Sequence, residues 1–433
     1  MERSGRRIVR GLLNQLDSTL LLLYFAGVVT GLINIYAAVY DPETERSFFD
    51  LTINSGKQFV WICCALAIAL FILLLDVRLY VKLAYPAYGA ILLMLVGVLL
   101  FGREIAGSKS WFDLGFMRFQ PSELAKVGTV LALARFLSDP NTKLMRPVNL
   151  MTVLLIIAAP AILTLLQGDT GSALVFASLS IMLYREGLPG QVLALGLMAG
   201  VLLILTLVFK AYLFELMLAI AGCGILYIIL FNRRKWKQAI GSALLTALAI
   251  AVVFSVDFFV YNVLKPHQQK RIEVLINPNA DVKGVGWQVN QSKIAIGSGG
   301  FSGKGFLEGT QTKFKFVPDQ STDFIFCTIA EEYGWLGSLA LITFFAVLLN
   351  RLIVIAERQK SRFTRVYAYG AVSILFFHFA VNIGMTIGLF PVIGIPLPFF
   401  SYGGSSLWSF TILLFILLKL DMHRKMPITS NFF

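Results

Sequence analysis

Apolar residues recur along the chain in runs of about 20 residues, the length at which an α-helix crosses the hydrocarbon core of a bilayer. Polar and charged residues gather in the links between these runs. The pattern predicts twelve membrane-spanning helices, at 18–40, 57–75, 83–101, 122–138, 149–167, 170–185, 190–209, 212–231, 238–258, 323–349, 366–388 and 405–420. We therefore predict an all-α polytopic integral membrane protein whose residues 1–433 form a single membrane domain.

The composition supports this membrane assignment. Of the 433 residues, 57% are hydrophobic and only 14% are charged, and the mean hydropathy is +0.77. About a quarter of the residues of a typical soluble domain are charged. The composition therefore excludes a soluble globular protein.

The distribution of basic residues predicts how the chain is oriented. Lysine and arginine are enriched in cytoplasmic loops. The segment Met1–Arg10 holds four arginines, and "DVRLYVK", "NRRKWK" and "NRLIVIAERQKSRFTR" fall on the same side as this segment when the predicted spans are counted. Both termini are accordingly expected in the cytoplasm.

One link on the outer side, 261–322, is far longer than the others. Its eight lysines and arginines exceed its acidic residues, and eight glycines lie between Gly284 and Gly309. Long loops of this kind are often functional. A cationic outer loop suits an anionic substrate at the outer leaflet, such as a lipid phosphate.

Polar residues at the outer ends of the spans form a second group of candidates. Ionisable groups at membrane depth are costly and are functional candidates for that reason. Glu123 and Lys126 in "RFQPSELAK" are one helical turn apart and can pair on one face. The segments "QGDTGSALVF", "PLPFFSYGGSS" and "FVPDQSTDFIF" add further polar residues at this end. We expect these segments to converge on an outer cleft, although each acidic residue taken singly could merely cap a helix.

Common cofactor motifs are absent from the sequence. There is no HExxH, no Walker A motif and no metal-ligand spacing of Cys and His, and His267, His378 and His423 are widely scattered. The stretch "GSGGFSGKG" lacks the final Ser or Thr of a P-loop. We therefore predict neither a dedicated metal site nor a nucleic-acid partner.

Five segments together resemble the SEDS family (shape, elongation, division, sporulation) of peptidoglycan polymerases, in particular its RodA-type elongation branch. In the family's order they are "GSKSWFDLGFMRFQPSELAK", "QGDTGSALVF", "GWQVNQSKIAIGSGGFSGKGFLEGTQ", "STDFIF" with "AEEYGWLG", and "NIGMTIGLFPVIGIPLPFFSYGGSS". The resemblance implies a glycosyltransferase that joins lipid II units into glycan strands at the outer face of the bacterial cytoplasmic membrane during cell elongation. It also implies a class B penicillin-binding protein, a transpeptidase, as partner.

The resemblance makes Asp323 of "TDFIF" the catalytic aspartate. Its carboxylate suits a general base that takes the proton of the attacking sugar hydroxyl. We expect Lys293 and Lys304 of the loop to hold the lipid diphosphate. The other candidates for substrate binding are Arg118, Glu123, Lys126, Asp169, Ser401 and Tyr402. Two alternatives stay open: Asp323 as a helix N-cap residue, and the two lysines as solvated loop residues.

The chain departs from the family pattern in two places. The family usually has Glu, another residue and His before the Thr-Asp pair, where this chain has Asp319, Gln320 and Ser321. No role for a histidine is therefore carried over. Three apolar segments lie in 190–258 where one is expected, which predicts an extra helix pair that preserves the sidedness of everything after it.

Some alternatives are not decided by the sequence. A lipid II transporter (flippase) is the main rival to the enzyme, and a scaffold that only recruits a partner is a weaker one. A transporter needs polar groups at the bilayer midplane, whereas the acids here lie at the outer ends of the spans. A divalent cation bound together with the substrate diphosphate is also left open.

Overall fold

The computed structural model describes residues 16–41, 47–105, 107–113, 115, 117–209, 212–232, 235–262, 269, 271, 273–274, 284–314 and 316–424. The arginine-rich start of the chain and part of the long outer link fall outside these residues. The chain divides into two compact units, one formed by Met1–Leu188 with Gln288–Phe433 and the other by Pro189–Trp287.

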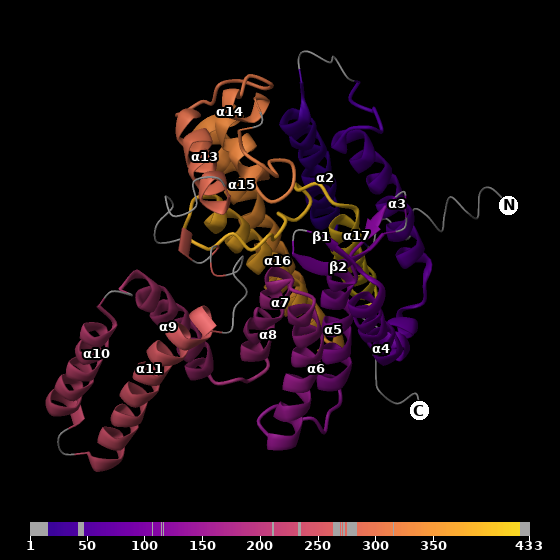
Figure 1. Cartoon of the computed structure of the whole chain (residues 1–433). Helices are drawn as coiled ribbons and strands as arrows, with labels where there is room; N and C mark the ends of the chain where they lie inside the picture. Colours follow the sequence, from indigo (N-terminus) through magenta and orange to yellow (C-terminus); the bar gives the residue numbers. More distant parts are fainter. Residues whose placement is uncertain are drawn as a thin grey trace. The chain divides into compact units, whose positions relative to one another are not determined.

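The first unit carries most of the helices and all of the strands that the structure describes (Figure 1). Its elements before residue 189 are α2 (Ser18–Val39), α3 (Asn54–Leu74), α4 (Val77–Phe101), β1 (Arg103–Ile105), β2 (Ser108–Asp113), β3 (Arg118–Phe119), α5 (Pro121–Leu137), α6 (Pro147–Leu166), α7 (Thr170–Ala177) and α8 (Leu179–Arg185). The later elements are α13 (Val285–Ser298), α14 (Thr310–Lys313), α15 (Ile325–Glu357), α16 (Arg362–Thr386) and α17 (Gly404–Met422).

The second unit consists of α9 (Gly190–Val208), α10 (Leu213–Tyr227) with the π-helical turn η2 (Ile228–Asn232), and α11 (Trp236–Asn262). Helix α11 packs against both α9 and α10. Leu202 of α9 and Ala249 and Val253 of α11 form the small buried cluster of this unit. These helices occupy the region 190–258, where the sequence predicts one span and an extra helix pair.

Nine of the described helices are long and apolar enough to cross a membrane. They confirm the prediction of an all-α polytopic membrane protein. The other three of the twelve predicted segments are shorter or broken in the described chain: α5 has 17 residues, 170–185 is divided between α7 and α8, and the apolar part of α9 is Gly190–Leu203.

The less hydrophobic helices of the first unit lie in its interior. Within the spans, 72% of α16 and 78% of α17 are buried, against 17% of α4 and of α6. Nearly every residue of α5 is also buried, and it packs on α4, α6, α16 and α17. Polar groups of a span need protein partners, whereas purely apolar helices can face lipid, which explains this sorting.

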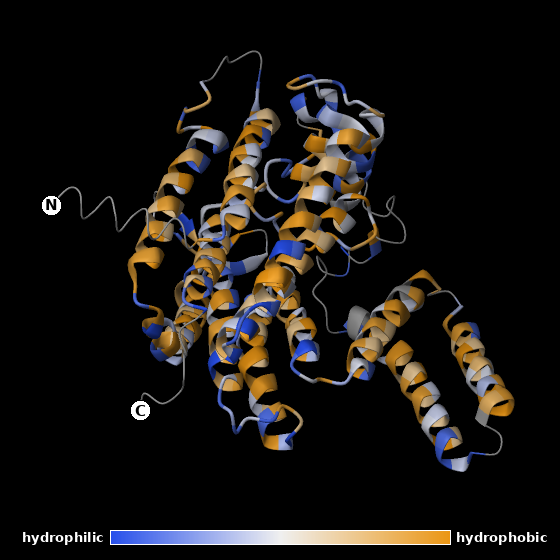
Figure 2. Ribbon diagram, turned by 180° about the vertical axis from the view of Figure 1, so that it is seen from behind, coloured by the Kyte–Doolittle hydropathy of each residue, from blue (hydrophilic) through white to orange (hydrophobic). Residues whose placement is uncertain are grey.

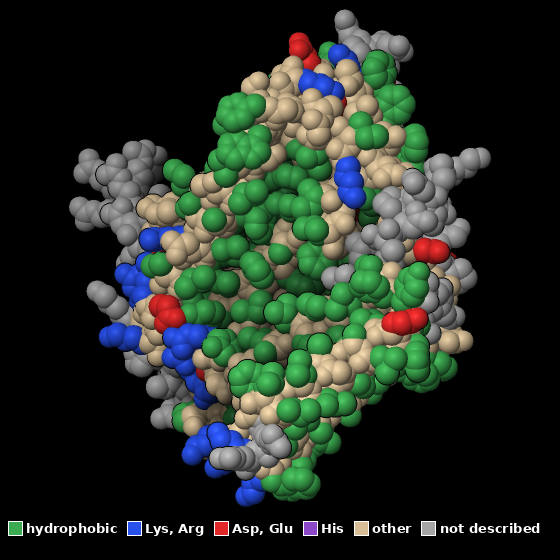
Figure 3. Space-filling view, turned by 90° about the vertical axis from the view of Figure 1, so that its left-hand side faces the viewer, with side chains coloured by type: hydrophobic (Ala, Val, Ile, Leu, Met, Phe, Trp, Pro, Cys, Tyr) green, Lys and Arg blue, Asp and Glu red, His purple; other side chains and the backbone are tan. Residues whose placement is uncertain are grey.

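The surface agrees with a lipid environment. Figure 2 shows hydrophobic residues along the helices and hydrophilic residues mainly at their ends and in the links. Figure 3 shows one face covered largely by hydrophobic side chains, with lysine and arginine mostly near its edges. A soluble protein rarely exposes apolar area on this scale.

The link between α4 and α5 contains a small sheet that the sequence pattern did not predict. Strands β1, β2 and β3 are antiparallel in the order β1-β2-β3, and Phe112 lies opposite Phe119. The sheet ends directly before Pro121, which begins α5 at a position where its missing N–H costs nothing. The strands are too short for their hydrophobic pattern to reveal them.

Helix α15 is interrupted close to its start. Gly334 has φ 64° and ψ −152°, a conformation that only glycine adopts readily. The glycine-rich segment 299–305 fills the gap: Lys304 N and Gly305 N donate to the carbonyls of Glu331 and Glu332 at 3.0 Å each. Trp335 N and Leu336 N in turn donate to the carbonyls of Gly300 and Phe301. The glycines therefore replace part of the helix's own hydrogen bonding.

Ion pairs tie together the helix ends on the predicted cytoplasmic side. Asp17, before α2, accepts from Arg351 at 2.7 Å and from Arg358 at 2.8 Å, and Arg358 also pairs with Asp421 of α17. Burial raises the pKa of Asp17, but the hydrogen bonds from the two arginines and from Leu20 N outweigh it, so that the pKa lies below its usual value. The basic residues that predict the orientation thus also fasten three helices to one another.

Candidate active site

Asp323 lies two residues before the first residue of α15 and is half-buried. Its backbone carbonyl accepts from Asn382 Nδ2 at 2.9 Å, and the same amide donates to the carbonyl of Ile395 at 2.7 Å. An ideal Cβ on Gly394 would be 3.4 Å from Asp323 Oδ2. Asp323 is therefore enclosed by the start of α15, by α16 and by the segment 387–403. The N-cap position of α15 belongs to Phe324, so the interpretation of Asp323 as the N-cap residue is wrong.

Ser401 and Tyr402 hold the chain around Asp323 in place. The Ser401 hydroxyl donates to the carbonyl of Thr322 at 2.6 Å and accepts from Leu397 N at 2.8 Å. Tyr402 N donates to the carbonyl of Ser321 at 2.8 Å. Ser401 is buried and its hydroxyl is fully used within the protein. These contacts fix the backbone on which the Asp323 side chain is mounted.

Gln120, the residue before α5, joins the start of α17 to Asp169. Gln120 N donates to Ser405 Oγ at 3.1 Å, and Gln120 Nε2 donates to Asp169 Oδ2 at 2.9 Å. Asp169 also caps α7 by accepting from Ser172 N at 2.9 Å. The polar segments that the sequence predicts at one end of the spans are thus joined by hydrogen bonds. Asp169 has both the capping role and a place in this network.

Glu123 and Lys126 form the predicted ion pair, with Lys126 Nζ 2.8 Å from Glu123 Oε2. Both side chains are almost completely buried, at 3% and 1% exposed. Lys126 Nζ is also 3.0 Å from His378 Nε2, and His378 Nδ1 is 3.0 Å from the carbonyl of Pro396. The network therefore connects α5 and α16 to the segment that encloses Asp323. Because of their burial, we treat Glu123 and Lys126 as positioning residues.

Lys304 is engaged by a buried carboxylate. Its Nζ is 2.7 Å from Glu331 Oε1, and Glu331 also accepts from the backbone N–H groups of Gln311 and Thr312. The Glu331 side chain is 0% exposed. The backbone N–H groups near Lys304 are used as well, since they complete α15. This segment therefore holds α15 by hydrogen bonds, and Lys304 with the N–H groups next to it is engaged within the protein.

Lys293 and Arg118 remain exposed. Lys293 projects from α13 across Gly388, on which an ideal Cβ would be 2.5 Å from its Nζ. Gly388 and Gly394 belong to the same segment, so this segment contacts both Lys293 and Asp323. Arg118 lies in β3 near Tyr402: burial raises the pKa of the Tyr402 phenol, and the positive charge of Arg118 acts in the opposite direction.

Asn382, His378 and Glu331 were not among the sequence candidates. Each lies within a predicted apolar segment, where a polar side chain is itself a signal. Asn382 and His378 are one helical turn apart on α16 and face the same segment. Among the described residues, no group of three His, Cys, Asp or Glu side chains is placed to hold a metal ion.

The fold and the site define a polytopic membrane protein in which the half-buried carboxylate of Asp323 and the exposed Lys293 lie close to one segment, 387–403. The family model FTSW_RODA_SPOVE, described as "Cell cycle protein", matches residues 17–219 and 214–426. The chain belongs to this family, and it is a multi-pass protein of the bacterial inner membrane.

Similar proteins match nearly the whole length of the chain. The peptidoglycan glycosyltransferase MrdB of Escherichia coli is 32% identical over 95% of this chain and 95% of its own. The peptidoglycan glycosyltransferase RodA of Treponema pallidum is 30% identical over 96% of this chain and 99% of its own.

Two solved structures share the fold. One, described as "Structural coordination of polymerization and crosslinking by a peptidoglycan synthase complex", has a TM-score of 0.70 at 29% identity and covers 95% of this chain and 99% of its own. The other, the Rod shape determining protein RodA of Thermus thermophilus, has a TM-score of 0.61 at 26% identity and covers 94% of this chain and 97% of its own.

Proposed function

We propose that this chain is a peptidoglycan glycosyltransferase of the elongation type, which polymerises lipid II at the outer face of the cytoplasmic membrane. The observation that carries the proposal is the position of Asp323, a carboxylate held at the start of α15 by Asn382 and by the segment 387–403. The family membership and the names of full-length relatives support the reaction class.

In this proposal Asp323 acts as the general base. Its carboxylate takes the proton of the acceptor's sugar hydroxyl while that oxygen attacks the anomeric carbon of the donor. The bond from that carbon to the diphosphate breaks, and the lipid diphosphate leaves with the electron pair. A positioned base of this kind contributes about 10²–10⁴-fold to the rate.

Negative charge builds up on the leaving diphosphate, so cations near it stabilise the transition state more than the ground state. Lys293 suits this role because it is exposed and contacts the segment that also contacts Asp323. Arg118 is the other exposed cation among the residues proposed to bind the substrate. Lys304 is less suited, since Glu331 already neutralises it. A divalent cation that arrives with the diphosphate would serve the same purpose and is part of the proposal.

Glu123, Lys126 and His378 support the site from within. They connect α5 and α16 to Pro396 and so fix the segment that contacts the carboxylate. We further propose that both termini are cytoplasmic and that the active face is extracytoplasmic. A class B penicillin-binding protein is the proposed partner, supported by the likeness to a chain from a peptidoglycan synthase complex.

The deciding experiment is polymerisation of lipid II in detergent by the purified full-length protein together with a class B penicillin-binding protein whose transpeptidase site is inactivated. A detergent micelle does not separate two compartments, so lipid II cannot be transported across it and any glycan product must come from polymerisation. Glycan strands in the product, resolved by gel electrophoresis, are the expected result. If no strands form while the protein moves lipid II across vesicle membranes, the chain is a transporter and not a polymerase.

A second prediction separates the two loop lysines. Lys293→Gln should lower the polymerisation rate about tenfold or more, because a charge near the leaving group is lost. Lys304→Gln should instead lower the melting temperature, because the buried Glu331 loses its ion-pair partner. Rates at saturating lipid II and thermal unfolding of both variants are the measurements.

The control for this comparison is Lys57→Gln, which changes an exposed lysine at the start of α3. Lys283, another loop lysine, lies outside the described residues. If Lys293→Gln and Lys57→Gln lose the same small fraction of the rate, Lys293 is a solvated residue of α13 with no role at the diphosphate.

A further inference from the structure

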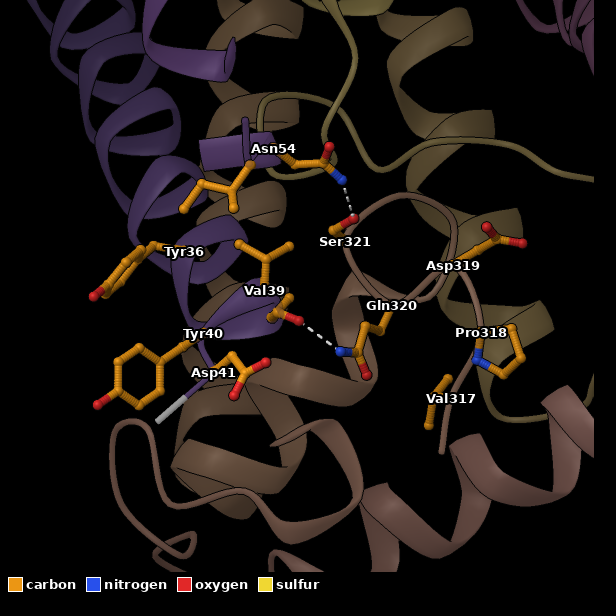
Figure 4. A pocket seen from close by; sticks show the side chains of 12 residues that line it. Tyr36, Val39, Tyr40, Asp41, Asn54, Val317, Pro318, Asp319, Gln320 and Ser321 are labelled. Atoms are coloured by element: carbon orange, nitrogen blue, oxygen red, sulfur yellow. Dashed lines mark hydrogen bonds between the residues drawn. The ribbon is translucent and has the colours of Figure 1, made fainter. Parts of the chain in front are cut away.

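A pocket of about 410 Å³ lies beside the chain segment that leads to Asp323. Its walls come from the end of α2, the start of α3 and the segment 317–321 (Figure 4). Tyr36 and Tyr40 lie toward one rim in this view and Asp319 toward the other, with Asp41 and Gln320 between them. The volume is within the ~300–1,000 Å³ typical of small-molecule sites.

The polar chemistry of this pocket differs from that expected for the diphosphate. Asp41 and Asp319 are carboxylates, and none of the described lining residues is a lysine or arginine. Two carboxylates repel a phosphate but accept hydrogen bonds strongly from hydroxyl and amide donors. Tyrosine rings add apolar faces with a polar end. Carboxylates, amides and tyrosines together suit an uncharged ligand rich in hydroxyl groups.

A buried amide in the wall is incompletely satisfied. The Nε2 of Gln320 donates to the carbonyls of Ala38 at 2.5 Å and Thr312 at 2.8 Å, which fixes the orientation of the amide. Its Oε1 has no hydrogen-bond partner, although the side chain is 93% buried. A buried acceptor without a donor is costly, and this oxygen lies behind the pocket surface, so the part of Gln320 that shapes the pocket is its fixed position in the wall.

The pocket is rigidly connected to the proposed base. Asn54 Nδ2 donates to Ser321 Oγ at 3.0 Å, and Tyr402 N donates to the carbonyl of Ser321 at 2.8 Å. Ser321 is two residues from Asp323. Asp319 adopts a left-handed backbone conformation, with φ 52°, which aspartate tolerates better than most residues. The tight turn at 319–322 thus places the pocket wall and the carboxylate on one short, fixed segment.

We infer that this pocket is a saccharide subsite that binds one N-acetylated sugar unit of the glycan next to the bond being formed. The inference rests on the proposed function, because the sugar is that of the substrate or the growing strand. Hydroxyl and N-acetyl N–H groups donate to Asp41 and Asp319, and an aromatic side chain at the rim packs on the apolar face of the ring. The subsite holds the sugar and takes no part in proton transfer.

The test measures binding of a soluble, lipid-free GlcNAc–MurNAc tetrasaccharide to the full-length protein in detergent by saturation-transfer NMR and calorimetry. The wild type and Asp323→Asn should bind it equally. The double variant Tyr40→Leu with Asp41→Ala should bind about tenfold more weakly or worse. Val39→Trp, which enlarges an apolar side chain of the lining, should do the same. Tyr184→Leu and Asp139→Ala, exposed residues away from the pocket, are the matched controls.

The outcomes separate this inference from the proposed function. Binding that depends on the pocket in a protein that makes no glycan would support the subsite and count against the polymerase. Polymerisation by the wild type, with tetrasaccharide binding that is absent or unchanged in folded Tyr40–Asp41 and Val39 variants, would overturn the subsite alone. A response to Mg²⁺ without any response to the saccharide would overturn it as well, in favour of a cation at Asp41 and Asp319.

Discussion

Asp323→Asn is expected to abolish polymerisation of lipid II while the protein stays folded and binds its partner. Asparagine keeps the size and the hydrogen-bonding capacity of the side chain but removes the basic oxygen. The backbone contacts with Asn382 and Ser401 do not involve the side chain and are preserved. The rate of glycan formation and co-purification with the penicillin-binding protein are the measurements.

Asp319→Asn is the matched control, since this carboxylate lies four residues away in the same turn. Asparagine also tolerates the left-handed backbone of this position, so the fold is maintained. Its effect should be milder than that of Asp323→Asn. If Asp323→Asn retains more than about a tenth of the wild-type rate, a loss smaller than general-base catalysis implies, the role of base must move elsewhere. Equal losses in the two variants would point to Asp319.

Lys126→Met should damage both folding and activity. Lys126 and Glu123 are buried together, so removal of the lysine leaves an uncompensated carboxylate in the interior. Breaking a buried pair in this way costs about 3–5 kcal/mol. We expect a lower yield of folded protein and a clear drop in melting temperature, measured by fluorescence-detected size exclusion and thermal unfolding in detergent.

The double variant Glu123→Gln with Lys126→Met distinguishes a lost contact from a stranded charge. It removes both charges and should recover folding, because no buried ion is left without a partner. Activity should stay low, since the connection from Lys126 through His378 to Pro396 is not rebuilt. Single and double variants that unfold at the same temperature would show that the two residues are not energetically coupled.

The sequence allowed the Glu123–Lys126 pair and the convergence of the polar segments to be predicted. The pair follows from helical spacing alone. The convergence follows from counting spans, because an even number of crossings returns the chain to the same face. The contact of Lys126 with His378 could not be predicted in this way. The two residues are 252 positions apart, and only the packing of α5 on α16 brings them together.

The role of the glycine-rich segment, in contrast, could not be predicted from its sequence. Its small residues and lysines are typical of an anion site, and the local sequence offers no sign of another use. The structure directs Lys304 to Glu331 and the neighbouring N–H groups to carbonyls of α15. Those acceptors exist only because α15 is interrupted at Gly334. A local pattern therefore could not reveal what the backbone donors do.

The interruption of α15 also determines how the end of the helix next to Asp323 is oriented. An unbroken helix is stiff. A change in the tilt of its long part after Gly334, here called the arm, would then also move the residues before Gly334. Here the short piece from Ile325 to Tyr333 is joined to the arm through Gly334 and through the glycine-rich segment, which is hydrogen-bonded to residues on both sides of the break. Helices tilt to match bilayers of different thickness, at a modest cost in free energy. In α15 the angle between the short piece and the arm is set by Gly334 and by the hydrogen bonds of the glycine-rich segment, so the direction in which the short piece meets Asp323 depends on residues of the outer link.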